Sequence, residues 1–246
     1  MVYDNAMNIK LDQINQQHYA YEEAVRIQSK FSVSELKKIA MGTREEQQEE
    51  TAILLPELAS LPAFMKEEEQ KEAAGTSTGT AYHRILELLS PERTWHTEVI
   101  QEEIDAYVAE GKIKPEAAAK VNAWKLYGFY QSELGKRYQQ AYKRGNLHRE
   151  QQFILTVPAC RINPEWISEE PVLLQGIMDA WFEEDGKLIL LDYKTDGHIT
   201  ETDLKKRYQR QFDLYKEALE QISGKKVEEM YLWSFSLGKA VDMSVN

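Results

Sequence analysis

The pattern of hydrophobic and polar positions changes near residue 146 and divides the chain into two parts. In the first part, over about residues 31–145, apolar side chains recur at helical spacing. This spacing predicts helices at 31–40, 81–89, about 96–110, and from Pro115 to about Tyr142. In the second part, over about 146–246, the pattern predicts strands at 151–157, 172–184, 187–194, 229–236 and 239–243. A helix is predicted over 201–222, and Gly224 ends it.

Three polar segments lie outside these elements. Residues 1–30 contain no glycine or proline and only scattered apolar positions, which predicts a linker or lead-in segment. Residues 44–72 are rich in Glu and Gln and predict a solvated excursion, and the sequence GTSTGT at 75–80 predicts a flexible turn. We therefore expect the linker to be followed by one domain over 31–246, in keeping with the usual length of about 150 residues per domain.

The charge of the chain is unevenly distributed. The 30 basic and 41 acidic residues give a net charge of −11, which by itself argues against a nucleic-acid partner. All of this excess lies in residues 1–110, which hold 10 basic and 21 acidic side chains, whereas residues 111–246 hold 20 of each. A site for an anionic substrate is therefore expected in the second part of the chain.

Several kinds of site and location are excluded or disfavoured by composition. The single cysteine, Cys160, excludes an internal disulfide, a zinc finger and a four-cysteine iron–sulfur site. The chain contains no GxxxxGK[ST] phosphate-binding loop, so it does not bind ATP by that route. No apolar run approaches the roughly 20 residues of a membrane span, and no secretory segment opens the chain. We expect a cytoplasmic protein that makes no contact with membranes.

A predicted hairpin brings two carboxylates together. A two-residue turn at Asp185-Gly186 pairs residue 184 with 187, and the same register places Asp179 opposite Asp192. Lys194 lies two residues beyond Asp192 and therefore projects from the same face. Opposed carboxylates repel each other, so three interpretations are open: a shared proton, a salt bridge to Lys194, or a bound divalent cation.

Two further residues are unusual for their positions. Gln211 lies within the apolar stripe of the 201–222 helix, either as a boundary residue bonded to nearby backbone or as part of a site. His83 lies on a largely apolar helix, either as a core or boundary residue or as a metal ligand. Basic residues on the 201–222 helix form either a solvated face or a set of phosphate contacts. These basic residues are Lys205, Lys206, Arg207 and Arg210.

The motifs GxxD at 176–179, DYK at 192–194 and QxxxY at 211–215 together resemble the RecB-type branch of the PD-(D/E)XK nucleases. Six blocks in the family's order extend this resemblance to the C-terminal nuclease domain of the AddA (RexA) family of bacterial helicase/nucleases. The blocks are FSVSELKK, the GTxxH helix, REQQF, QGIMD, LLDYKTD and YQRQFDLYKEAL. The resemblance implies an α/β restriction-endonuclease-like core. In such a core a mixed central sheet, flanked by helices, carries the active site on an antiparallel hairpin.

The resemblance also implies roles for individual residues. The metal ligands would be His83, Asp179, Asp192 and the backbone carbonyl of Tyr193. Lys194 would orient or help to activate the attacking water and offset phosphate charge. Gln211 and Tyr215 would support the site and contact DNA, and Glu150 matches the acidic residue of the family's first strand.

The function implied is that of a metal-dependent deoxyribonuclease of exonuclease type, within a complex that processes double-strand DNA ends for recombinational repair. Oxygen ligands favour Mg²⁺, and a histidine ligand makes Mn²⁺ a suitable substitute. The implied partners are DNA, in the form of single-stranded ends, N-terminal helicase domains of the same polypeptide, and the AddB (RexB) protein of the same complex. The alternative is a non-catalytic DNA-end-binding or subunit-interaction module, which should have lost Asp179, Asp192 or Lys194.

Overall fold

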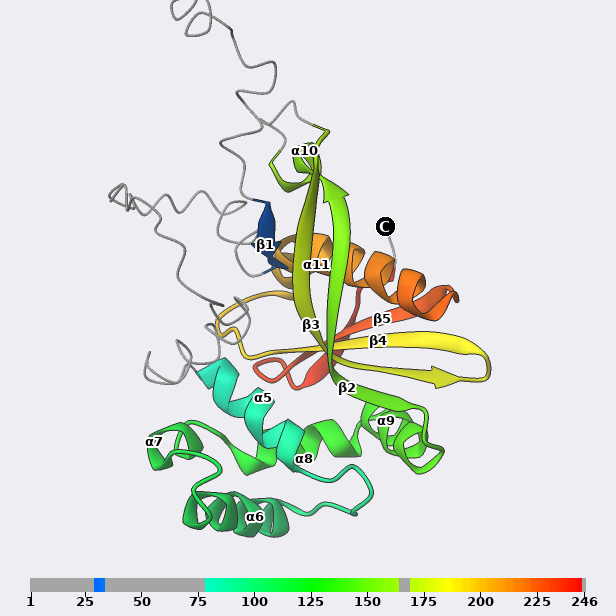
Figure 1. Cartoon of the computed structure of the whole chain (residues 1–246). Coiled ribbons are helices and arrows are strands. Elements are labelled where there is room, and N and C mark those ends of the chain that lie inside the picture. Colours follow the sequence, from blue (N-terminus) through cyan, green and yellow to red (C-terminus); the bar gives the residue numbers. More distant parts are fainter. Residues whose placement is uncertain (1–28, 34–77, 164–168, 245–246) are drawn as a thin grey trace, which may run out of the picture. The chain divides into compact units, whose positions relative to one another are not determined.

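The computed structural model of the chain describes residues 29–33, 78–163 and 169–244 (Figure 1). Residues 1–28 of the linker predicted over 1–30, the excursion at 44–72 and most of the helix predicted at 31–40 lie outside the described residues. The helices are α5 (Thr78–Leu88), α6 (Thr97–Ala109), α7 (Pro115–Ala118), α8 (Ala123–Gln131), α9 (Glu133–Lys143), α10 (Ala159–Ile162) and α11 (Glu201–Ser223). The strands are β1 (Lys30–Ser32), β2 (Leu147–Pro158), β3 (Pro171–Glu184), β4 (Lys187–Lys194), β5 (Val227–Ser234) and β6 (Lys239–Asp242).

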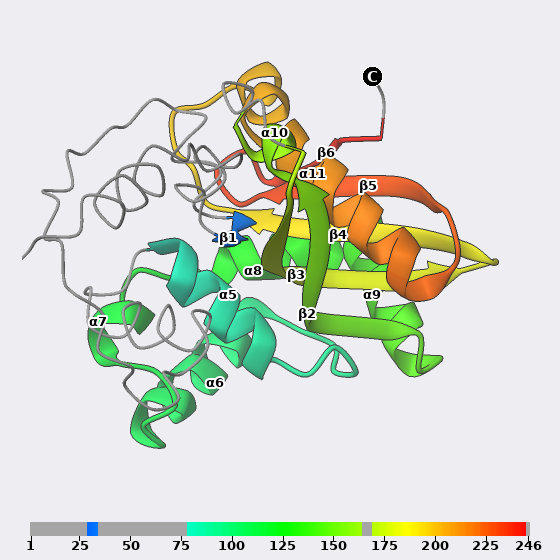
Figure 2. The same cartoon turned by 45° about the horizontal axis from the view of Figure 1, so that its top comes forward.

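The strands form one mixed sheet. Its order is β1-β3-β4-β5-β6, and β2 also pairs with β3. β1 pairs parallel to β3 and β4 parallel to β5, whereas the β3–β4 and β5–β6 pairs are antiparallel. The parallel β4–β5 pair needs a crossover connection, and α11 supplies it (Figure 2). The described residues fall into two compact units, one with 29–33, 154–163 and 169–175 and the other with 78–153 and 176–244.

The hairpin between β3 and β4 has the predicted register. Asp185 (φ 51°) and Gly186 (φ 80°) both adopt positive φ, as the central residues of a type I′ turn must. Pairing runs from Glu184 with Lys187 to Ala180 with Leu191. Asp179 and Asp192 are the next residues outward along this register.

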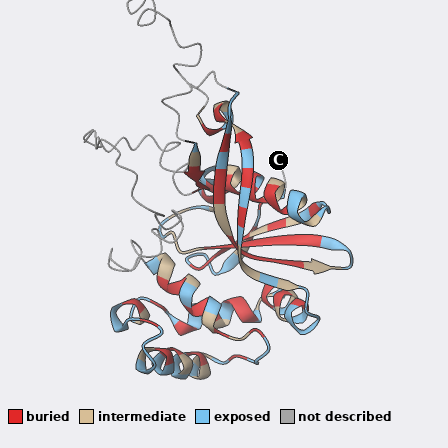
Figure 3. Ribbon diagram, viewed as in Figure 1, coloured by how far each residue is buried: buried red, intermediate tan, exposed pale blue. Residues whose placement is uncertain are grey.

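In the second unit, the sheet has two differently covered faces. The residues of β4 that alternate toward one face, among them Leu191 and Tyr193, belong to a buried core with α5, α6, α8 and α9. On the other face α11 packs against β5, and its side chains reach Asp192 on β4. Figure 3 shows the buried residues continuing along β4 and along the helix faces. The site residues of β4 therefore face α11, since 192 and 194 alternate with the core positions.

Helix α11 begins and ends at strong local signals. Thr200 accepts a hydrogen bond from the backbone N–H of Asp203, whose side chain in turn accepts from the Thr200 N–H, which makes a capping box. Gly224 ends the helix in the left-handed conformation, as predicted. The helical spacing of apolar residues predicts one buried stripe from Leu204 to Ile222. The stripe is buried through Leu219, but Ile222 is 53 % exposed, so the prediction is wrong for this last residue.

Lys30–Ser32 form strand β1, which was not predicted, and Val33 directly after it is helical, in agreement with a helix start at Ser32. Two other predictions about the first part of the chain are wrong. Helix α5 begins at Thr78, within the predicted turn at 75–80. The helix predicted over about 115–142 is three helices, α7, α8 and α9, because Asn122 and Ser132 each adopt extended backbone and cap a new helix.

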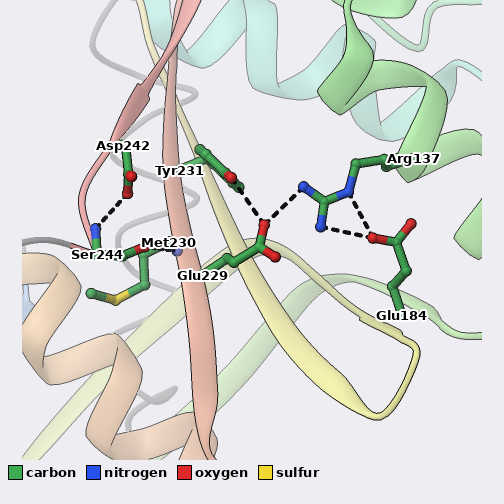
Figure 4. A network of polar contacts seen from close by, with 7 residues as sticks. All are labelled: Arg137, Glu184, Glu229, Met230, Tyr231, Asp242 and Ser244. Atoms are coloured by element: carbon green, nitrogen blue, oxygen red, sulfur yellow. Dashed lines mark hydrogen bonds and ion pairs between the residues drawn. The ribbon is translucent and has the colours of Figure 1, made fainter.

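An ion-pair network fastens α9 to the hairpin and to β5 (Figure 4). Arg137 donates from Nε to Glu184 Oε2 at 2.7 Å and from a terminal nitrogen to Glu229 Oε2 at 2.8 Å. The hydroxyl of Tyr231 donates to the same Glu229 oxygen at 2.9 Å. These contacts join the helical layer to two strands of the sheet.

None of the helices in the described ranges has the length and apolar character needed to cross a membrane.

Candidate active site

The two hairpin aspartates, Asp179 on β3 and Asp192 on β4, are both buried. Asp179 is 7 % exposed and Asp192 is 1 % exposed. The backbone N–H of Tyr193 donates to Asp179 Oδ2 at 2.7 Å, which fixes this carboxylate against β4. Of the three interpretations of the pair, the salt bridge is present, because Lys194 forms an ion pair with Asp192 Oδ2.

His83, carried by α5, joins the other carboxylate. Its Nδ1 lies 3.2 Å from Asp179 Oδ1, and its Nε2 lies 3.0 Å from the carbonyl oxygen of Tyr193. Burial alone would lower the pKa of His83, but the adjacent Asp179 carboxylate outweighs it and raises that pKa. Burial alone would raise the pKa of Asp179, but the charge and hydrogen bond of His83, with help from Lys194, lower it to about 2. Three of the four predicted metal-ligand groups are thus in contact: the imidazole of His83, the carboxylate of Asp179 and the carbonyl of Tyr193.

Glu150 belongs to the same cluster. Ligand atoms of His83, Glu150 and Asp179 all lie within 4.8 Å of one another. Glu150, within strand β2, has φ 48°, a left-handed conformation that is uncommon for a residue with a side chain. Such conformations persist where the surrounding structure holds them, often at functional sites.

Arg149, beside Glu150, holds the helix that carries His83. One of its terminal nitrogens donates to the carbonyl oxygens of Leu86, Glu87 and Leu89, at 3.2 Å each. These carbonyls lie in the last turn of α5 and, for Leu89, directly after it, where backbone acceptors lack partners within the helix. Sequence reasoning placed Arg149 in the REQQF block but assigned it no role. The local signal for a role of Arg149 was its position next to Glu150, the acidic residue of the first strand.

Gln211 and Lys194 both bind Asp192. The side-chain amide of Gln211, which is 5 % exposed, donates to Asp192 Oδ1 at 3.0 Å. Burial alone would lower the pKa of Lys194, but the carboxylates of Asp192 and Asp179 outweigh it and raise that pKa. The lysine is therefore held as an ammonium. The structure thus brings Gln211 to the aspartate pair, away from the charged face of α11.

Tyr215 lies one helical turn beyond Gln211 and is 5 % exposed. Burial raises the pKa of Tyr215 well above its usual value, and the neighbouring Asp192 and Asp179 add to this effect, so the phenol stays neutral. Its ring packs edge-on against Phe153 of β2 at 5.5 Å between centroids.

Lys205 and Arg207, two of the basic residues singled out on α11, form ion pairs along the helix and with the loop before it. Lys205 lies 3.5 Å from Glu201, and Arg207 donates to Asp196 Oδ1 at 2.7 Å. This pairing is typical of a solvated helix face. A phosphate-binding role for Lys205, Lys206, Arg207 and Arg210 stays a prediction.

The donor set fits a hard divalent cation. The imidazole of His83 stands among the carboxylates of Glu150 and Asp179, with the Tyr193 carbonyl in contact with the same ring. The Oε1 atom of Gln211 is buried and has no hydrogen-bond partner among the described residues, although the same side chain holds Asp192. Oxygen donors with one imidazole suit Mg²⁺ or Mn²⁺ rather than zinc.

A family model described as the PD-(D/E)XK nuclease superfamily matches residues 55–243. The chain belongs to this superfamily. Members of the PD-(D/E)XK superfamily generally use divalent metal ions, which agrees with the donor set above. The mixed sheet with flanking helices is the fold that the sequence motifs implied.

Two curated relatives are named as the A subunits of ATP-dependent helicase/nucleases. The protein from Lachnoclostridium phytofermentans is 34 % identical over 217 residues, which cover 74 % of this chain and 16 % of the relative. The protein from Clostridium perfringens is 35 % identical over 242 residues, which cover 92 % of this chain and 19 % of the relative. The resemblance to the AddA family is therefore confirmed, and this PD-(D/E)XK domain spans less than a fifth of the relatives' length.

Proposed function

We propose that this PD-(D/E)XK domain is a divalent-metal-dependent deoxyribonuclease that hydrolyses phosphodiester bonds of an unwound DNA strand. The observation that carries the proposal is the intact constellation at the end of β4. Asp192 is bound by both Lys194 and Gln211, next to the cluster of His83, Glu150 and Asp179. A module that had lost catalysis would have no physical reason to retain two buried carboxylates beside a buried lysine.

The residues divide into a metal-holding group and a group that acts on the nucleophile. His83, Asp179, Asp192 and the carbonyl of Tyr193 would hold the cation, with Glu150 beside them. When bound, a divalent cation polarises the scissile phosphate and lowers the pKa of a water molecule.

Lys194 and the two residues of α11 make up the second group. The ammonium of Lys194 orients the attacking water and offsets the negative charge that grows on the phosphate oxygens. Gln211 keeps Asp192 in place through its 3.0 Å hydrogen bond, and Tyr215 lines the same face as a neutral phenol that can donate to DNA.

The biological setting follows from the relatives' name. We infer that the domain acts as the exonuclease of a cytoplasmic helicase/nuclease. That complex would process double-strand DNA ends for recombinational repair, and its other parts would be helicase domains in the same polypeptide and the AddB (RexB) protein. The chain's net charge of −11 suits this setting, because the DNA channel would then be supplied mainly by the other domains.

The test is cleavage of an end-labelled single-stranded oligonucleotide by this chain with Mg²⁺, with Mn²⁺ and with excess EDTA. We expect cleavage with either cation, none in EDTA, and loss of cleavage in Asp192→Ala and Lys194→Ala. The matched control is Asp213→Ala, an exposed aspartate of α11. Cleavage that persists in EDTA would refute the metal mechanism. DNA binding without cleavage, unchanged in the two site variants, would support the non-catalytic alternative.

A further inference from the structure

The ammonium of Lys194 touches two groups. It forms an ion pair with Asp192, and its Nζ lies 4.9 Å from the ring centroid of Tyr208 on α11. The lysine side chain is only 12 % exposed. Lysine carries its charge on a flexible four-carbon stem, so a single ion pair leaves the ammonium free to swing about its partner. The aromatic face supplies a second restraint, because a cation is attracted to the face of an aromatic ring.

Tyr208 is itself fixed at its far end. Its hydroxyl donates to Asp196 Oδ2 at 2.8 Å, and the residue is 7 % exposed. The other oxygen of Asp196 accepts from Arg207 at 2.7 Å, and the Asp196 backbone carbonyl accepts from the Ser236 hydroxyl. The loop that leaves β4 is thereby tied to α11 and to the turn after β5. The hydrogen bond to Asp196 therefore fixes the position of the Tyr208 hydroxyl, and the burial of the residue restricts rotation of the ring about its long axis.

The same helix face holds both members of the Asp192–Lys194 pair. Tyr208 and Gln211 are three residues apart on α11, so their side chains are neighbours on one face. Gln211 binds Asp192 Oδ1, and Tyr208 contacts the Lys194 ammonium. Burial, and then the hydrogen-bonded Asp196 carboxylate, raise the pKa of Tyr208, so its hydroxyl stays a donor.

We propose that Tyr208, anchored by Asp196, is a positioning residue that holds the Lys194 ammonium in place for phosphodiester hydrolysis. The inference deepens the proposed nuclease function and rests on it. It assigns a role to two residues, Tyr208 and Asp196, that the metal-binding cluster does not use. The competing view is that Tyr208 only fills the core as part of the apolar stripe of α11.

Two variants of Tyr208 and one control separate these views. Tyr208→Leu keeps apolar bulk but removes the aromatic face, whereas Tyr208→Phe keeps the face and removes the hydroxyl. The control is Phe182→Leu, which also removes a buried aromatic ring beside a cation, since Arg137 lies 5.9 Å from that ring. Phe182 belongs to the core on the opposite face of the sheet.

Steady-state cleavage of single-stranded DNA gives the first readout. We expect kcat of Tyr208→Leu to fall roughly tenfold to thirtyfold with KM within about twofold, the size of a desolvated cation–π contact. Tyr208→Phe should keep at least about a third of wild-type kcat. Phe182→Leu should keep kcat within about twofold despite a comparable loss of melting temperature. Equal kcat in Tyr208→Leu and Phe182→Leu, or equal losses in both Tyr208 variants, would overturn the proposal.

A second readout does not depend on cleavage. The rate of Lys194 acetylation by a mild amine reagent in metal-free buffer is followed by mass spectrometry. We expect Tyr208→Leu to raise this rate roughly tenfold, because the ammonium is no longer held against the ring. Tyr208→Phe, which keeps the ring but loses its anchor to Asp196, should raise the rate by no more than about threefold, and Phe182→Leu should leave it near wild type. An unchanged rate in Tyr208→Leu would overturn the proposal. An inactive wild-type protein would refute the nuclease function, and the acetylation rates would still decide the position of Lys194.

Discussion

Removing Asp192 should destabilise the protein even when no metal is bound. Asp192 is 1 % exposed and forms an ion pair with Lys194, whose side chain is 12 % exposed. Asp192→Ala leaves that ammonium buried without its partner and also leaves the amide of Gln211 without its acceptor. Breaking one side of a buried pair costs about 3–5 kcal/mol. Because Asp179 also acts on Lys194, we expect the lower end, about 3 kcal/mol.

The assay is thermal unfolding in EDTA, followed by circular dichroism. For a chain of about 150–250 residues, 1 kcal/mol shifts the melting temperature by about 2–4 °C, so a fall of about 6–12 °C is expected. The control Asp213→Ala, at an exposed position of α11, should stay within about 0.5 kcal/mol of wild type. The double variant Asp192→Leu/Lys194→Met removes both charges and should recover most of the loss.

The opposite result has a clear meaning. If Asp192→Ala melted at or above the wild-type temperature in EDTA, repulsion between Asp179 and Asp192 would outweigh the ion pair. That result would mean that Lys194 does not compensate the charge of the buried aspartate. Failure of the double variant to recover would instead place the cost in packing rather than in the unpaired charge.

Three further results are expected. Arg149→Met should lower stability by about 1–3 kcal/mol in urea unfolding, because three carbonyls of α5 lose their donor, and an unchanged midpoint would refute that role. Gly135→Ala should destabilise the protein by at least about 3 kcal/mol, since a Cβ there would lie 1.9 Å from the Phe129 carbonyl oxygen; near-wild-type melting would contradict this close approach. The hydrogen bond from Arg137 lowers the pKa of Glu229 in the folded protein. The contribution of the Glu229 carboxylate to folding stability is therefore present above its unfolded-state pKa of about 4.3, and it is lost as pH falls through the lower folded-state pKa. Stability measured from pH 5 down to about pH 3 should therefore fall less in Glu229→Gln than in wild type, and parallel curves would rule this out.

The β3–β4 hairpin is a feature that local sequence was sufficient to predict. Asp185 and Gly186 favour a turn with two positive φ angles, and the strict two-residue alternation of strands then determines which side chains share a face. The register and the common face of Asp192 and Lys194 could therefore be predicted. The start and end of α11 follow equally local signals, at Thr200 and Gly224.

In the region after Pro115, the local pattern was not sufficient to predict the helix boundaries. Residues that favour helix continue through Asn122 and Ser132, so the spacing of apolar positions predicts one long helix. The helix is interrupted at Asn122 and Ser132 because their side chains cap new helices, and because Gly135 packs against the carbonyl of Phe129. Propensity is weak compared with packing, and the packing was not visible in the sequence.

By itself, the sequence determined the hairpin register, the faces of β4 and α11, and the family to which the chain belongs. The family resemblance implied that His83 and Asp179 share a site, but the tertiary structure alone decided that Glu150 joins them and that Tyr208 meets Lys194. Alternation and helical period relate residues within one element or one hairpin, because they arise from local backbone geometry. Contacts between α5, β2 and β3 depend on how separate elements pack, and no local period encodes the distance between residues 83, 150 and 179.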